Sequence, residues 1–272
     1  MCSSSQSPTA AEASFRAHRP EGGADPLAHY RQAQRPPPDG RPWMLSNFVA
    51  GIDGAITIDG RVDGLSSSRD QIVFALLRSL ADLVLVGAGT FRAEPYPPVR
   101  LPASLQAERE ERGQAPVPSL AVVSRSLQLD WDRPAFTAAG PRPIVITSAA
   151  ADPGARTRAE RVADVVVAGE EHVDLTVALA ALRERGHEVV LCEGGATLLA
   201  ELLHLGVLDE LCLTIAPLVG GDPSRVVADQ PRPPLTRFEL AQVLTAGDEL
   251  YLRYLRRPAG DGEPPDGGPI DG

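Results

Sequence analysis

Short runs of apolar residues recur through the middle of the chain, and segments with helical periodicity separate them. Residues 83–86 and 189–192 are apolar at every position, which is typical of strands buried on both faces of a parallel sheet. Residues 198–205 carry leucines at helical spacing and predict an amphipathic helix. The expected strands are residues 43–50, 83–86, 120–124, 144–148, 164–168, 189–192, 208–215, 237–245 and 249–255.

This alternation of strands and helices predicts one α/β domain over residues 41–256. Its sheet should be mostly parallel, with helices on both faces and two antiparallel strands at one edge. Residues 1–40 are expected to form a flexible N-terminal extension, with a single helical turn around Tyr30, and residues 257–272 a disordered tail. Residues 102–118 are polar and contain proline, which favours a surface excursion.

The composition excludes several classes of protein. The 272-residue chain has a formal net charge of −10 and no basic run, so it is not expected to bind nucleic acid. All 26 basic residues are arginine, which excludes Schiff-base chemistry on lysine and a P-loop lysine. No window approaches 18 apolar residues and the N-terminus lacks an apolar signal core, so we expect a cytoplasmic protein without a membrane span.

Cysteine and histidine give no sign of a metal centre. The three cysteines form no CxxC pair, and two of them lie in apolar runs, so buried reduced thiols are expected. The five histidines are scattered without ligand spacing. The sequence therefore predicts no metal site.

A glycine pair marks the first candidate site. Gly194 and Gly195 follow the strand at residues 189–192 and precede the helix at residues 198–205, so free helix N–H groups and a bare turn could receive a pyrophosphate. The alternative is a tight turn without a ligand. Glu193 favours the site, because a carboxylate at the carboxyl end of a buried strand lies where open α/β sheets bind ligands.

Three weaker signals lie elsewhere in the chain. Residues 87–90 (GAGT) form a second glycine turn, but Arg92 in place of a later glycine excludes the Rossmann fingerprint. Residues 124–126 (Ser-Arg-Ser) follow a strand and suit a phosphate monoester, the alternative being an exposed turn. Asp70 lies in the first turn of a helix, where it is either a functional acid or a capping residue.

Four motifs in this order resemble the riboflavin-biosynthesis pyrimidine reductase family. They are NFVAGIDG (residues 47–54), LADLVLVGAGTFRAE (80–94), VLCEGGATLLAELL (190–203) and LDELCLTIAPLVGGD (208–222). The resemblance covers residues 41–256 and is to the reductase half of the bifunctional deaminase–reductase. It implies a three-layer dihydrofolate-reductase-like fold. No zinc deaminase motif accompanies it, so a stand-alone reductase is expected.

The resemblance implies NADPH as the hydride donor and a role for each matching residue. Cofactor contacts are expected from two glycine loops, the serine–arginine turn and the first strand: Gly87, Ala88, Gly89, Thr90, Gly194, Gly195, Ala196, Thr197, Leu198, Ser124, Arg125, Ser126, Val49 and Ala50. The serine–arginine turn should read the 2′-phosphate that distinguishes NADPH from NADH, and the first strand should line the nicotinamide. The positions that hold the phosphorylated pyrimidine correspond to Arg78, Glu94, Arg100 and Glu193.

Two departures from the family pattern fall on the substrate side. Residues 62–66 lack the usual tryptophan, and residues 93–96 read Ala-Glu-Pro-Tyr where the family commonly has Ala-Asp-Asp/Asn-Pro. Asp70 occupies the place of the acid that binds the pteridine ring in dihydrofolate reductases. A carboxylate suits an amino-pyrimidine edge, so Asp70 is expected to orient or protonate the substrate. Glu193 is expected to anchor the substrate.

These features favour an NADPH-dependent reductase of a riboflavin-pathway pyrimidine. Two alternatives remain at this point: the same chemistry on dihydrofolate, and an NADPH-binding protein without catalysis. A homodimer is expected because family members are dimers and because the strands over residues 208–215 and 237–255 invite edge pairing.

Overall fold

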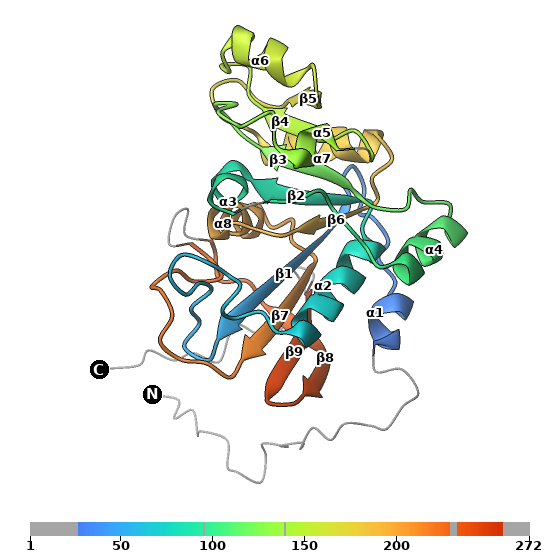
Figure 1. The fold of residues 1–272 in the computed structure, drawn as a ribbon, viewed down its shortest axis with the longest axis vertical. Coiled ribbons are helices and arrows are strands. Elements are labelled where there is room, and N and C mark those ends of the chain that lie inside the picture. The colour runs from blue at the N-terminus through green and yellow to red at the C-terminus, as the bar shows by residue number, and fades with distance from the viewer. Residues whose placement is uncertain (1–26, 95, 139, 229–232, 258–272) are drawn as a thin grey trace, which may run out of the picture.

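The computed structural model describes residues 27–94, 96–138, 140–228 and 233–257. Within these residues one sheet has the strand order β5-β4-β3-β2-β6-β1-β7-β9-β8, which Figure 1 shows from β5 at the top to β8 at the bottom. Its strands are β1 (Trp43–Gly51), β2 (Leu83–Gly87), β3 (Ser119–Val123), β4 (Ile144–Thr147), β5 (Asp164–Val167), β6 (Val189–Cys192), β7 (Glu210–Ala216), β8 (Phe238–Ala246) and β9 (Glu249–Arg256).

Helices cover both faces of this sheet. They are α1 (Ala28–Gln32), α2 (Ser68–Leu80), α3 (Ala88–Ala93), α4 (Ala103–Glu111), α5 (Pro134–Thr137), α6 (Pro153–Ala159), α7 (Leu175–Glu184) and α8 (Ala196–His204). Leucines of α7 and α8 pack with Met44, Leu85 and Val190 on one face. The cores around α2 and around α3, α5 and α6 cover the other face.

The strands from β5 to β7 pair in parallel, and β9 and β8 close the sheet in antiparallel pairing. This arrangement confirms the mostly parallel α/β sheet with antiparallel edge strands, in the three layers of a dihydrofolate-reductase-like fold. Strand β6 lies between β1 and β2 although it begins only at Val189, long after both in the sequence, so the order of the sheet reverses beside it. Such a reversal places a crevice at the carboxyl ends of the strands.

The β1–β6 pairing ends before β1 does. Ser46 pairs with Cys192, the last residue of β6, whereas β1 continues to Gly51 beside β7 only. The edge of β1 beyond Ser46 therefore faces the glycine pair that follows β6 and not another strand. The second half of β1 thus has a strand partner on its β7 side only.

The segment over residues 102–118 lies mostly at the surface, as predicted, but the prediction missed a helix within it. This segment contains α4, whose Leu105 and Arg109 are buried. The Arg109 guanidinium donates to the carbonyl oxygens of Ser79 and Ala81 and satisfies the C-terminal end of α2. A helix that buries an arginine in this way looks polar in sequence, which is why the pattern missed it.

The predicted flexible extension also needs correction where the structure describes it. Tyr30 on α1 is 1% exposed, which agrees with the predicted helical turn. Arg35 forms a two-point ion pair with Glu210, with Nε–Oε2 and Nη2–Oε1 distances of 2.8 Å. Residues 27–40 therefore pack against the start of β7, whereas residues 1–26 and 258–272 lie outside the described residues.

Candidate active site

The two glycine turns lie side by side at the carboxyl ends of β2 and β6. The Gly87 N–H donates to the Gly194 carbonyl at 2.8 Å, which joins the turns directly. Gly194 has a φ of 121°, in the region that favours glycine. A methyl group built on Gly195 would lie 2.6 Å from Oγ1 of Thr90. The turns therefore approach each other too closely for a side chain at Gly195.

Two helices begin at these turns. Gly87 precedes α3 and Gly195 precedes α8, and neither residue provides a side-chain cap for its helix. The first N–H groups of each helix thus remain available at the same edge of the sheet. Two helix N-termini together provide positive potential and hydrogen-bond donors for an anion.

The serine–arginine turn at the end of β3 borders the same groove. The groove has a volume of about 540 Å³ and is lined by three predicted segments, residues 87–90, 124–126 and 195–198. Ser124 is buried, and its hydroxyl accepts from the Leu127 N–H, so this side chain shapes the turn. Arg125 is exposed at the rim and has no ion pair among the described residues.

Two charged residues of this groove were missed by the sequence reasoning. Arg92, one turn into α3, adds a second guanidinium near Arg125. The sequence could have indicated this role, because Arg92 is a cation that follows the glycine turn at residues 87–90 by two positions. Glu201 on α8 is the other, and burial raises the pKa of its carboxyl. The groove is therefore lined by two cations and by a partly buried acid on α8.

Val49 and Ala50 lie in the half of β1 that has no strand on its β6 side. They pair with Thr214 and Ile215 of β7 and are 7% and 2% exposed. Because β6 has ended by this point, their backbone faces the crevice beside Gly194. The predicted backbone contact of these two residues with the nicotinamide stays a prediction.

A buried ion pair connects α2 with the end of β6. The Arg78 guanidinium donates to both carboxylate oxygens of Glu193, at 2.6 and 2.7 Å, and lies over the Phe74 ring at 4.0 Å. The Tyr96 hydroxyl donates to the same carboxylate. Burial opposes the charge of Arg78, but Glu193 outweighs it and raises the pKa of the guanidinium. Tyr96 was missed because it lies where the chain departs from the family pattern.

Asp70 forms a second polar cluster at the other end of α2. Ser67, and not Asp70, caps this helix, since its hydroxyl accepts from the N–H groups of Arg69 and Asp70. The Ser66 hydroxyl donates to Oδ2 of Asp70 at 2.5 Å, whereas Oδ1 has no partner among the described residues. Burial raises the pKa of Asp70, although Ser66 and Thr214 favour the charged form. The net effect favours the protonated form of this acid.

The remaining two predicted substrate residues lie apart from these clusters. Glu94 ends α3 with a half-buried side chain in electrostatic range of Arg61, across the mouth of the cleft. Arg100 is exposed and makes no hydrogen bond or ion pair with a described residue. The structure thus joins Arg78 to Glu193 but does not bring Glu94 or Arg100 to them.

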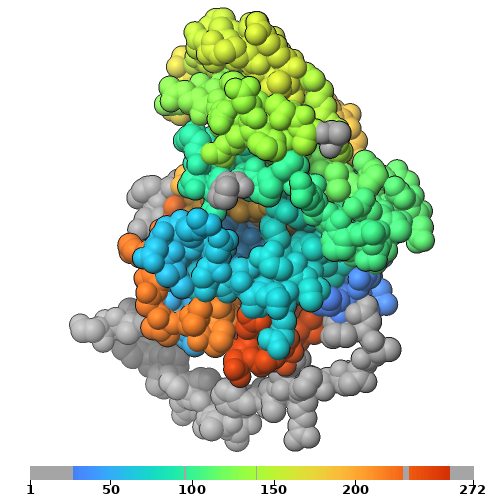
Figure 2. Space-filling view, in the orientation of Figure 1, coloured from blue at the N-terminus to red at the C-terminus, as the bar shows by residue number. Residues whose placement is uncertain are grey.

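A hollow lies between α2 and the loop after β1. Figure 2 shows it at the centre of the molecule, between the loop after β1 and α2, with β1 visible at its floor. Asp70 and Arg78 stand on α2 eight residues apart, about 12 Å along the helix axis.

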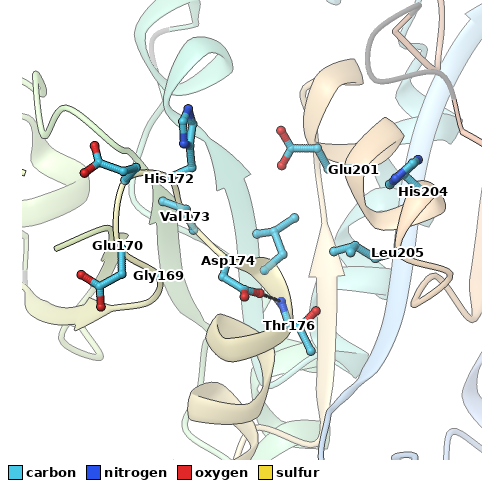
Figure 3. A pocket seen from close by; sticks show the side chains of 11 residues that line it. Gly169, Glu170, His172, Val173, Asp174, Thr176, Glu201, His204 and Leu205 are labelled. Carbon is cyan, nitrogen blue, oxygen red and sulfur yellow. Dashed lines mark hydrogen bonds between the residues drawn. The ribbon is translucent and has the colours of Figure 1, made fainter. Parts of the chain in front are cut away.

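A second pocket opens on the far side of Glu201. Figure 3 shows it between α8, with Glu201, His204 and Leu205, and the loop that carries His172 and Asp174. None of the residues predicted from the sequence lines it. Among the described residues, no group of three or more His, Cys, Asp or Glu side chains is arranged to hold a metal ion. In the same residues no helix is long and apolar enough to cross a bilayer.

The fold and the crevice define a dihydrofolate-reductase-like α/β protein with its site at the carboxyl ends of β2, β6 and β1. The chain belongs to the RibD C-terminal domain family, whose model matches residues 42–252. This membership confirms the family resemblance seen in the four motifs.

The chain is similar to proteins that are named as reductases. The chain is 29% identical to the 2,5-diamino-6-ribosylamino-4(3H)-pyrimidinone 5′-phosphate reductases of Archaeoglobus fulgidus and Methanothermobacter thermautotrophicus. These alignments cover 70% and 79% of this chain and 87% and 98% of the relatives. A pyrimidine reductase-like protein from Corynebacterium diphtheriae superposes with a TM-score of 0.72 at 27% identity, over 87% of this chain and 97% of that one.

Proposed function

We propose that this protein is an NADPH-dependent reductase of a ribosylamino-pyrimidine phosphate in riboflavin biosynthesis. The proposal rests on one observation: the Gly87 N–H donates to the Gly194 carbonyl, which joins the two glycine turns at the carboxyl ends of β2 and β6. Family membership and the named relatives support the same activity.

The reductase relatives imply a nicotinamide cofactor, and we propose NADPH in particular. The bare turn at Gly195, the free ends of α3 and α8 and the size of the groove fit a dinucleotide diphosphate. Arg125 and Arg92 supply two guanidinium groups at the groove end, and guanidinium matches phosphate geometry. A 2′-phosphate there would explain both cations.

The cofactor supplies the hydride when it is bound, and the protein residues hold and orient the substrate. Asp70 presents a buried carboxyl whose raised pKa suits the delivery of a proton to the reduced nitrogen. Glu193 already accepts from Arg78 and Tyr96, so we assign it the role of fixing α2 to the end of β6. This differs from the expectation that Glu193 anchors the substrate directly.

The two alternatives make different predictions in one assay. NADPH oxidation is measured in parallel with the riboflavin-pathway pyrimidine and with dihydrofolate. The proposal requires turnover with the pyrimidine and much lower kcat/KM with dihydrofolate. Turnover with dihydrofolate alone would support the first alternative, and binding of NADPH without turnover on either compound would support the second.

We propose further that the protein acts in the cytoplasm as a homodimer. Its free, buried Cys192 and Cys212 suit a reducing compartment. The structure corrects one reason given for dimerisation, because β7 is an interior strand between β1 and β9. The edge strands are β5 and β8, and we propose pairing through β8, on which Leu240 is 51% exposed.

A further inference from the structure

A second buried carboxyl group lies near Asp70. It belongs to Glu249, the first residue of β9, and the two residues are 6% and 4% exposed. Burial is the main cause of the raised pKa of Asp70, and the negative charge of Glu249 adds to it. Two carboxyl groups in one buried cluster do not both ionise easily. The hydrogen-bond donors around them therefore decide which one carries a proton.

Two hydroxyl groups donate to Glu249. The Ser67 hydroxyl donates to its Oε2 at 2.9 Å, and the Tyr251 hydroxyl donates to the same oxygen at 2.7 Å. An ionised carboxylate is an acceptor only, whereas a protonated carboxyl must also donate. Two converging donors therefore suit a negative charge on Glu249.

The surroundings of Asp70 differ from those of Glu249. The Ser66 hydroxyl donates to Oδ2 of Asp70 at 2.5 Å, whereas Oδ1 has no partner among the described residues. An oxygen without a donor can carry a proton at no loss of a hydrogen bond. Asp70 is therefore the member of the pair that suits the proton.

The strand register places Glu249 on the face of the sheet that α2 covers. Tyr251 is the ladder partner of Thr214 on β7, and it packs in the core under α2. Side chains two residues apart on a strand share a face, so Glu249 faces the same way as Tyr251. The Thr214 hydroxyl in turn favours the charged form of Asp70, which places this acid beside the same strands.

Ser67 ties Glu249 to the first turn of the helix that carries Asp70. Its hydroxyl accepts from the N–H groups of Arg69 and Asp70, at 3.2 and 3.1 Å, and thereby caps α2. The same hydroxyl donates to Glu249. One side chain thus joins the Glu249 carboxylate to the Asp70 backbone and holds that carboxylate in a fixed place.

Other ionisable groups on the elements packed against this acid are neutral or exposed. Burial raises the pKa of the Tyr251 hydroxyl and of the Cys212 thiol, so both groups are neutral at pH 7. Arg69 on α2 and Asp248 in the β8–β9 turn are exposed, so water screens their charges. The buried charge that acts on this acid from β9 is therefore that of Glu249.

We propose that Glu249 is a positioning residue for Asp70, which places a buried negative charge beside the first turn of α2 and so keeps the proton on Asp70. This inference rests on the proposed function, in which Asp70 delivers a proton to the substrate. Glu249 acts through Asp70 and not through a contact with the substrate.

The test compares Glu249→Gln with Asp248→Asn in the full chain. Glutamine keeps an oxygen that accepts from Ser67 and Tyr251 but removes the charge, whereas Asp248→Asn removes the same charge from the adjacent, exposed residue. Carbon-13 NMR of labelled aspartate carboxyl groups follows the titration of Asp70, whose signal is assigned with Asp70→Asn. NADPH oxidation at saturating pyrimidine gives kcat as a function of pH, and calorimetry gives the Kd of NADPH.

Glu249→Gln should make Asp70 lose its proton at a lower pH than in wild type, because the repelling charge is gone. The alkaline limb of the kcat profile should move in the same direction, so that kcat on this limb falls about 10-fold. The value of kcat on the acid side, the Kd of NADPH and both curves of Asp248→Asn should stay as in wild type. If Glu249→Gln does not fold, Tyr251→Phe should move both curves the same way, because it removes one donor from Glu249.

Titration of Asp70 at an unchanged pH in Glu249→Gln would overturn the inference, as would an equal change in Asp248→Asn. A changed titration with an unmoved kcat profile would contradict the positioning role. A wild type that binds NADPH but reduces no pyrimidine would refute the proposed function. The NMR titration needs no substrate, so it would still decide whether Glu249 holds the proton on Asp70.

Discussion

The two carboxylate oxygens of Asp70 have different surroundings, and this asymmetry defines its chemistry. Oδ2 accepts from Ser66, whereas Oδ1 is buried and free. Replacement by asparagine keeps an acceptor for Ser66 but removes the ionisable proton. We expect Asp70→Asn to lower kcat about 10²- to 10⁴-fold with the Kd of NADPH unchanged. Unchanged turnover in the NADPH oxidation assay would contradict this role.

The same substitution has a predicted effect on stability. Burial raises the pKa of Asp70 in the folded protein, so the folded state holds this proton more tightly than the unfolded state, in which the pKa is about 3.9. Stability is therefore lost as the pH rises from that value through the folded pKa. Asp70→Asn removes the loss, so its free energy of unfolding relative to wild type should be higher at pH 7 than at pH 4. Urea denaturation at both pH values measures this difference.

Arg125 tests the choice between the two nicotinamide cofactors. It is exposed at the rim of the groove and has no ion pair there, so a 2′-phosphate would be its partner. We expect Arg125→Ala to raise the KM for NADPH about 10- to 100-fold through loss of charge-assisted hydrogen bonds. The KM for NADH should not change. Arg161→Ala, an exposed arginine outside the groove, is the control. An equal effect on both cofactors would contradict 2′-phosphate recognition.

At the scale of elements, Arg35 ties the segment before β1 to the sheet. Glu210 is fully buried and pairs with both Arg35 and Arg253. Burial opposes its charge, but the two arginines lower the pKa of Glu210, so this stability is present at neutral pH and is lost as the pH falls through the folded pKa. Arg35→Ala should lower the free energy of unfolding by about 3–5 kcal/mol at pH 7.

The control for this network is Arg61→Ala. Arg61 pairs with Asp63, but both side chains are more than half exposed, so loss of this ion pair should leave the midpoint of thermal unfolding unchanged. Equal shifts of the unfolding midpoint in Arg35→Ala and Arg61→Ala would show that the buried network does not hold the N-terminal segment in place.

The hydrophobic pattern predicted β2 and β6 well because each contains an uninterrupted apolar run. The observed ends of β2 and β6 differ from the predicted ones by one residue at most. The pattern failed at α4, where a buried Arg109 satisfies backbone carbonyls and reads as a polar surface residue. It also could not reveal that Tyr96 completes the Glu193 cluster, because that contact joins residues 97 positions apart.

At the scale of the whole molecule, the sequence predicted which segments are strands but not their neighbours. The insertion of β6 between β1 and β2 depends on long-range pairing, and it is this insertion that brings the two glycine turns together. The cofactor segments could be found as local motifs, whereas the substrate side depends on contacts between distant elements.

The central claim is that Gly87–Thr90 and Gly194–Gly195 together hold a dinucleotide diphosphate. Calorimetric titration of NADPH into wild type and Gly195→Ala tests it most directly, with Gly140→Ala as the control because a methyl group there meets open space. We expect one NADPH per chain for wild type and Gly140→Ala, and at least tenfold weaker binding for Gly195→Ala, whose methyl group would crowd Thr90. Absence of binding to wild type, or equal affinity in all three proteins, would contradict the account.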